Sequence, residues 1–142
     1  MIVHKSITVA RPADVAFKIF VEEIQQWWPL ESYSFLGPDA TITIEPREGG
    51  RFFQSSPDGR EYTIGEVTGY EPGRRLAYTW NHGQDRGTTH VEIRFIAEGS
   101  STRLEVAHSG WESLTDQTLA AGYDSGWNPV LAAYVEHADS AS

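Results

Sequence analysis

The first two thirds of the chain alternate between apolar and polar positions, a pattern that predicts half-buried β-strands. In residues 2–10, Val3, Ile7 and Val9 share one face of such a strand. Further runs follow the same rule, and short turns rich in Gly, Pro, Asp and Ser separate most of them. These runs are 41–45, 51–54, 60–70, 76–80, 91–95 and 104–108. About seven strands joined mostly by short turns predict an antiparallel meander.

One of these runs, residues 60–70, breaks its own alternation. Tyr62 and Ile64 lie in one phase, whereas Val67 lies in the other. A β-bulge near Gly65 would bring them to one face, because a bulge inserts one extra residue and shifts the phase. A bulge also bends its strand, so the sequence predicts a curved sheet at this point.

Two segments have helical periodicity instead. Residues 12–28 begin with Pro12, which suits the first turn of a helix, and end before Pro29, which cannot continue one. Their apolar spacing predicts one broken helix or two short ones. The second segment starts at about Asp116 and predicts one long C-terminal helix. Its apolar stripe consists of Leu119, Tyr123, Trp127, Val130, Leu131, Tyr134 and Ala138.

The long helix contains three residues that weaken helices. Gly122 and Gly126 each cost about 1 kcal/mol relative to Ala, and Pro129 costs about 3 kcal/mol. Such a local cost predicts a bent helix or a close approach of its backbone to the sheet.

The order of elements predicts the architecture. One strand, two short helices, six strands and a long helix make an α+β domain, and the apolar face of the sheet must be covered. The C-terminal helix is long enough to run across it. We therefore expect one α+β domain over residues 1–142, in which a curved antiparallel sheet of about seven strands wraps around the helix and leaves a gap beside it.

Length and charge narrow the classes of partner. A chain of 142 residues is expected to form one domain with a sizeable core. The net charge of -9 disfavours nucleic acid and anionic membrane surfaces as partners. No apolar run reaches the length of about 18 residues that a membrane span needs, no secretory signal is evident, and cysteine is absent. The expected location is the cytoplasm.

Aromatic residues are the best evidence for a ligand cavity, since aromatic walls with a few polar tips suit an apolar ligand. The alternative for any one ring is ordinary core packing. Because neighbouring helix residues point in different directions, one of Trp27 and Trp28 should face a loop or a cavity mouth. The predicted lining comprises Trp27, Trp28, Tyr33, Phe35, Phe52, Ile64, Tyr78, Trp80, Val91, Ile93, His108, Trp111, Tyr123, Trp127 and Leu131.

His108 lies in phase with Leu104 and Val106 and is predicted to point inward. A buried His needs a hydrogen-bond partner. It is either a structural residue bonded to a Tyr or a backbone group, or a polar anchor or general base for a ligand. His82 and His90 flank a polar loop, but their spacing matches no zinc pattern, so a solvated hairpin without metal is expected. We predict no metal and no cofactor.

Several short motifs occur in one order along nearly the whole chain. They are Gly49-Gly50-Arg51-Phe52, Pro57-Asp58-Gly59, Gly65-Glu66-Val67, Pro72 with Arg75-Leu76 and Tyr78-Thr79-Trp80, Thr102-Arg103-Leu104, His108-Ser109-Gly110-Trp111, and Gly126-Trp127 with Leu131. The set resembles the START-like (SRPBCC) superfamily, in the branch named after the activator of heat-shock-protein-90 ATPase. The resemblance implies a helix-grip fold with an interior hydrophobic cavity. It implies no single activity, because lipid carriers, hormone receptors, cyclases and co-chaperone domains share this fold.

Three functions remain open from the sequence. The first is binding of a hydrophobic or amphipathic small molecule, such as a lipid, polyketide or aromatic compound. The second is a chaperone-linked role in the stress response, as the family name implies. The third is a cyclase or hydrolase activity with His108, Glu66 and Tyr78 as acid–base groups, although no catalytic motif supports it.

Overall fold

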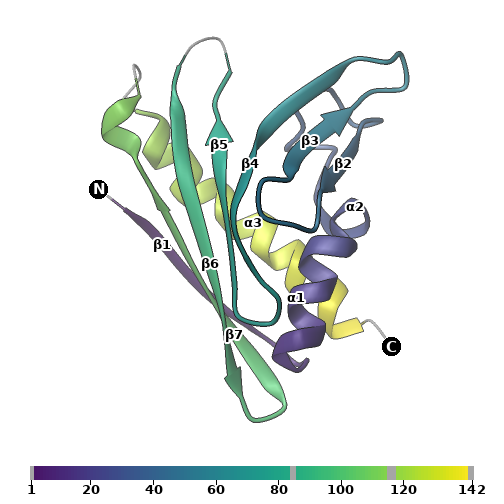
Figure 1. Ribbon diagram of the computed structural model, residues 1–142, viewed down its shortest axis with the longest axis vertical. Coiled ribbons are helices and arrows are strands. Elements are labelled where there is room, and N and C mark those ends of the chain that lie inside the picture. Colours follow the sequence, from purple (N-terminus) through teal and green to yellow (C-terminus); the bar gives the residue numbers. More distant parts are fainter. Residues whose placement is uncertain (1, 84–85, 115–117, 141–142) are drawn as a thin grey trace.

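The computed structural model describes residues 2–83, 86–114 and 118–140. Seven strands form one antiparallel sheet in the order β1-β7-β6-β5-β4-β3-β2 (Figure 1). In chain order the elements are β1 (Val3–Val9), α1 (Ala13–Glu22), α2 (Ile24–Trp27), β2 (Thr41–Ile44), β3 (Arg51–Ser55), β4 (Glu61–Glu71), β5 (Arg75–Asn81), β6 (Thr88–Glu98), β7 (Ser101–Ser109), the 3-10 turn η1 (Trp111–Ser113) and α3 (Leu119–Ser140). The predicted α+β helix-grip architecture is confirmed, with two short helices after the first strand.

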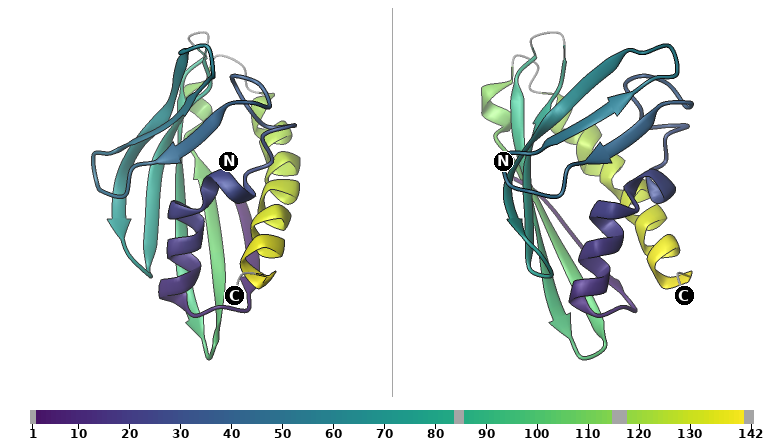
Figure 2. Two further views of the ribbon diagram at one scale, coloured as in Figure 1. Left: turned by 90° about the vertical axis from the view of Figure 1, so that its right-hand side faces the viewer. Right: turned by 45° about the vertical axis from the view of Figure 1, so that its right-hand side comes forward.

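The sheet curls where the sequence predicts a bulge. Phe52 pairs with Gly65 and Phe53 with Thr63, which makes Ile64 the extra residue of β4. A second shift in β4, between Val67 and Gly69, interrupts its pairing with β5. Bulges bend the strand that carries them. As a result β2 reaches α1 and α2, and Figure 2 shows the sheet curving round toward the helices.

Gly65 also allows β4 and β5 to approach each other closely. A Cβ atom at this position would lie 1.8 Å from the carbonyl oxygen of Thr79. No other residue fits that distance, so the glycine is a requirement of the bend and not merely tolerated by it.

The C-terminal half of α3 packs against a solid aromatic core beside α1 and α2. The Tyr134 ring lies 5.1 Å from that of Phe20 and 5.2 Å from that of Trp27, measured between ring centroids. The Tyr134 hydroxyl donates to the carbonyl oxygen of Ala16 at 2.7 Å, which ties α3 to α1. Phe20 in turn contacts Phe95 of β6. This end of the molecule is filled.

The glycines of α3 do not have the close contact with the sheet that their cost suggested. A Cβ atom at Gly122 would meet no atom within 4 Å, and one at Gly126 would meet only Tyr33, at 3.8 Å. The helix continues through Pro129, which is exposed. The two glycines therefore leave space instead of permitting contact, and that space belongs to the candidate site.

Candidate ligand-binding pocket

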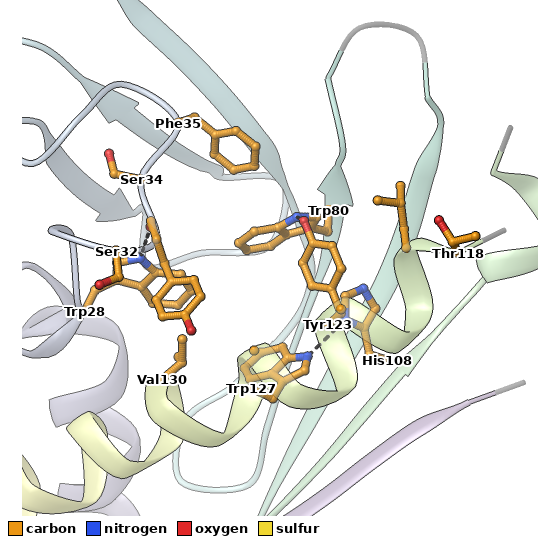
Figure 3. A pocket seen from close by; sticks show the side chains of 14 residues that line it. Trp28, Ser32, Ser34, Phe35, Trp80, His108, Thr118, Tyr123, Trp127 and Val130 are labelled. Atoms are coloured by element: carbon orange, nitrogen blue, oxygen red, sulfur yellow. Dashed lines mark hydrogen bonds between the residues drawn. The ribbon is translucent and has the colours of Figure 1, made fainter. Parts of the chain in front are cut away.

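A pocket with a volume of about 410 Å³ lies between the N-terminal half of α3, the segment 28–35 and the ends of β5 and β7 (Figure 3). Most of its walls are apolar. The lining residues are Trp28, Ser32, Tyr33, Ser34, Phe35, Trp80, His108, Thr118, Leu119, Gly122, Tyr123, Gly126, Trp127 and Val130. On α3 these positions recur every three or four residues, so a single face of the helix forms one wall.

The structure brings seven of the fifteen predicted lining residues to this pocket, namely Trp28, Tyr33, Phe35, Trp80, His108, Tyr123 and Trp127. The other eight lie buried in the packed core and do not line it, namely Trp27, Phe52, Ile64, Tyr78, Val91, Ile93, Trp111 and Leu131. Alternation correctly places the strand residues among them on the inner face, but other side chains already fill the space beside all eight.

The two adjacent tryptophans divide as the helix geometry requires. Trp28 lines the pocket, and its indole N–H donates to the carbonyl oxygen of Tyr33 at 2.7 Å. Trp27 points into the core, where its N–H lies 3.3 Å from the carbonyl oxygen of Phe20. The prediction that one of the pair faces a loop or cavity mouth is confirmed.

A buried glutamine fixes the segment that covers the pocket. Gln54 of β3 is 1% exposed. Its amide oxygen accepts from the backbone N–H of Phe35 at 2.8 Å, and its amide nitrogen donates to the hydroxyl of Ser34 at 2.8 Å. The Phe35 ring also stacks on Tyr62 with 4.2 Å between centroids. Sequence reasoning missed Gln54, although a polar residue at an inward strand position signals such a bond.

The sequence analysis also missed the glycine positions as part of the site. Gly122 and Gly126 lie four residues apart and so share one helix face with Tyr123 and Trp127 nearby. Spacing of four between glycines, within a stripe of large residues, was the available signal. Ser32, Ser34 and Thr118 gave no such signal because they lie in irregular segments.

His108 is fully buried and both of its ring nitrogens are engaged. Nδ1 lies 3.1 Å from the indole N–H of Trp127, which can only donate, so Nδ1 accepts. Nε2 lies 2.6 Å from the hydroxyl of Thr89, which lies 2.8 Å from Nε2 of His82. In neutral His108 the proton therefore sits on Nε2 and is donated to Thr89, which donates to His82 in turn.

The environment keeps His108 in this neutral form. Burial, followed by the charges of the nearby His82 and His90, lowers the pKa of His108 to about 3. Protonation would also place a second N–H against that of Trp127. The residue is structural, as one sequence interpretation held, but its partners are Trp127 and Thr89 instead of a Tyr or the backbone. Neither nitrogen is free to act on a ligand while these bonds hold.

His82 does not lie in a solvated hairpin, as the sequence suggested. It is 4% exposed, and its ring packs against those of Trp111 and Tyr123. Burial, followed by the charge of Arg86, lowers its pKa. His90 by contrast is exposed, so the two histidines do not converge. Across the described residues, no group of three or more His, Cys, Asp or Glu side chains is placed to hold a metal ion.

Tyr123 is held at the centre of the aromatic wall. The indole N–H of Trp80 donates to its hydroxyl oxygen at 2.9 Å. Its ring contacts His82, His108 and Trp111 at centroid distances of 5.0, 5.5 and 5.4 Å. Burial raises the pKa of Tyr123, so the hydroxyl stays protonated at neutral pH.

The other two predicted acid–base candidates lie elsewhere. Glu66 is exposed and lines a polar hollow with Arg51 and Thr79, apart from the pocket. The Tyr78 hydroxyl is buried without a hydrogen-bond partner among the described residues, and it does not line the pocket. The three groups are therefore not brought together.

Comparison with known proteins places the chain in a family. The family model described as "Activator of Hsp90 ATPase homolog 1-like protein" matches residues 10–137. The chain belongs to this family. The match confirms the START-like resemblance that the motifs indicated. No curated protein matches the sequence.

Several solved structures have the same fold as this chain over almost its full length. A Mesorhizobium loti protein, MLL2253, is 22% identical with a TM-score of 0.72, and the match covers 96% of this chain and 95% of that one. CalU16 from Micromonospora echinospora is 21% identical with a TM-score of 0.69, covering 98% and 76%. The anthrahydroquino-gamma-pyrone synthase Txn09 is 27% identical with a TM-score of 0.66, covering 95% of each chain.

Among the described residues, no helix combines the length and the apolarity that a membrane-spanning helix needs.

Proposed function

We propose that this member of the family binds an apolar, mainly aromatic small molecule in the pocket beneath the N-terminal half of α3. The observation that carries the proposal is the pocket itself: about 410 Å³ of space bounded by six aromatic residues and His108. Ligand pockets typically span about 300–1,000 Å³ and are lined by apolar and aromatic groups with a few polar ones. The proposed location is the cytoplasm.

The charge of the wall supports an uncharged ligand. Among the described residues, none of the fourteen that line the pocket is Asp, Glu, Lys or Arg. His108 is neutral because burial lowers its pKa. A charged ligand would lose its hydration here without gaining an opposite charge, which is costly.

The glycines of α3 also support a binding role. Each costs about 1 kcal/mol in a helix relative to Ala. Gly122 meets no atom within 4 Å along its Cβ direction, so no packing requirement explains it. Its effect is to keep the wall of the pocket open.

A plugged variant tests the proposal. Gly122→Leu should fill the pocket and leave the fold intact, because its side chain enters open space. We expect native mass spectrometry and titration of Trp fluorescence to show binding of apolar aromatic compounds to the natural chain and at least tenfold weaker binding to the variant. Ala132→Leu is the matched control, since Ala132 is exposed on the same helix and does not line the pocket. Equal binding by Gly122→Leu, or no binding by the natural chain, would contradict the proposal.

A second candidate, an interaction with a heat-shock-protein-90 chaperone, rests on the family description. The outer surface of β5–β7 offers charge instead of an apolar patch, with ion pairs such as Arg75–Glu92 at 2.6 Å and Arg103–Glu98 at 3.2 Å. Such a surface favours salt-sensitive docking. Addition of the protein to the chaperone should then raise its ATP hydrolysis at low salt, and an unchanged rate would count against this candidate.

Catalysis in the pocket is a weaker candidate. The synthase Txn09 shares the fold at 27% identity. In this chain, however, His108 uses both ring nitrogens within the protein, and Glu66 and Tyr78 lie away from the pocket. The arrangement supports holding a ligand better than transferring protons to it.

A further inference from the structure

The hydrogen-bonding groups of the pocket wall are mostly engaged within the protein. The indole N–H groups of Trp28, Trp80 and Trp127 each donate to a protein acceptor. Both ring nitrogens of His108 have partners. These groups shape the wall but offer a ligand little polar recognition.

Tyr123 differs from these groups. Its hydroxyl oxygen accepts from Trp80 at 2.9 Å, and the hydroxyl donates to no other group among the described residues. A phenol has one hydrogen to donate. Accepting one hydrogen bond makes a hydroxyl a better donor, because the bonds in a chain polarise one another. The wall therefore presents one strengthened donor that lacks an acceptor within the described protein.

The donor is also held in place. The Tyr123 ring is enclosed by His82, His108 and Trp111. His108 is itself fixed between Trp127 and Thr89. A donor with a fixed direction loses little entropy on binding, so it discriminates strongly between ligands with and without an acceptor.

We propose that the ligand of this pocket is an uncharged aromatic carbonyl compound whose oxygen accepts the hydrogen bond of the Tyr123 hydroxyl. This inference rests on the proposed function and adds the chemical class of the ligand. Ser34 and Tyr33 are the competing donors. The Ser34 hydroxyl accepts from Gln54 and from the backbone of Leu36 and has its own hydrogen free. Tyr33 also lines the pocket with a hydroxyl group. Ser34 lies on the covering segment, whereas Tyr123 is packed within the wall.

Fluorenone and fluorene are suitable probes, since they share one ring shape and differ by a carbonyl group against a methylene. The quantity to measure is the ratio of the fluorene Kd to the fluorenone Kd. Each Kd is obtained from the quenching of Trp fluorescence. Tyr123→Phe should lower this ratio about tenfold, the size of one lost hydrogen bond in a desolvated site. Tyr70→Phe, which removes a tyrosine hydroxyl that does not line the pocket, should leave it unchanged.

Tyr123→Phe leaves the N–H of Trp80 without its acceptor, and that N–H is then available to the ligand. The same ratio is therefore compared between Trp80→Phe and the double variant Trp80→Phe/Tyr123→Phe. A fall in either background supports the assignment. An unchanged ratio in both backgrounds, or a fall produced by Ser34→Ala or Tyr33→Phe instead, overturns it.

Failure of the inference differs from failure of the proposed function. Suppose that both probes bind the natural chain, that Gly122→Leu weakens their binding, and that the ratio of the two Kd values is the same in every other variant. The pocket then binds ligands without Tyr123 as donor. If neither probe binds the natural chain, the proposed function fails together with the inference.

Discussion

The two halves of α3 cross the same face of the sheet, yet one half is packed and the other is hollow. In the C-terminal half, Leu131, Tyr134 and Ala138 are at most 2% exposed and pack against the core. In the N-terminal half, Gly122 and Gly126 have no side chain and border the pocket. The curl of the sheet serves both halves.

The difference lies in what fills the concavity. Beside the C-terminal half, α1 and α2 supply rings such as Phe20 and Trp27 that meet Tyr134 edge-on. Beside the N-terminal half lies the irregular segment 28–35, which Gln54 holds over the pocket and which does not fill it. In this fold the cavity therefore forms where an irregular segment replaces the helices α1 and α2 beside the sheet, and where α3 carries glycines.

The largest effect is expected from removing a ring at the packed end. Phe20→Ala should lower the free energy of unfolding by about 3–5 kcal/mol, because it leaves a cavity in a close-packed core. Phe35→Ala at the pocket should cost about 1 kcal/mol or less, since Phe35 is 41% exposed. Urea unfolding measures both values. Similar losses for the two variants would remove the contrast between the packed and hollow ends.

Much of the fold behind this contrast could be predicted from the sequence. The break in phase between Ile64 and Val67 correctly predicted a bulge beside Gly65, because side-chain alternation in a strand is strict. The stripe from Leu119 to Ala138 placed α3 across the sheet. Both are consequences of local periodicity, which a single sequence records directly.

The identity of the lining residues was not accessible in the same way. Periodicity places Phe52 and Trp80 on one inner face, but only the opposite wall decides that Trp80 borders the pocket while Phe52 is covered. That wall comes from residues far along the chain, such as Tyr123. His82 shows the same limit, since its burial depends on Thr89 and Trp111 and not on its neighbours in sequence.

The hollow end should also respond to pH. The pKa of His108 is about 3 in the folded chain and about 6.5 when unfolded. Between these values the unfolded state binds a proton that the folded state does not. Stability should therefore fall as pH drops from about 6.5 toward 3, by up to about 1.4 kcal/mol per pH unit. His82, whose pKa is also lowered, acts in the same direction.

Chemical unfolding at a series of pH values measures this slope. Carboxylates contribute to it below about pH 5, so the natural chain is compared with His108→Phe between pH 5 and 6.5. The variant should show a shallower slope there. Equal slopes would mean that His108 is not buried in its neutral form at the pocket.

Two tyrosine hydroxyls provide a smaller, opposite pair of effects. The Tyr78 hydroxyl is buried without a partner among the described residues, so Tyr78→Phe should raise stability by about 1 kcal/mol. The Tyr123 hydroxyl accepts from Trp80, so Tyr123→Phe should lower stability by about 1 kcal/mol. Urea midpoints distinguish the signs. A loss for Tyr78→Phe would show that its hydroxyl finds a partner, such as an internal water.

The smallest effect concerns the glycines and returns to the space beneath α3. Gly122→Ala adds a methyl group where no atom lies within 4 Å, and it improves helix propensity, so we expect a gain of about 0.5–1 kcal/mol. In thermal unfolding this corresponds to a rise in Tm of about 3 °C. Gly65→Ala is the matched control, and it should destabilise the chain, because its Cβ would lie 1.8 Å from the Thr79 carbonyl oxygen. A methyl group in open space has no atom to displace. If Gly122→Ala also lowered the Tm, position 122 would therefore be packed against other atoms and would not border open space.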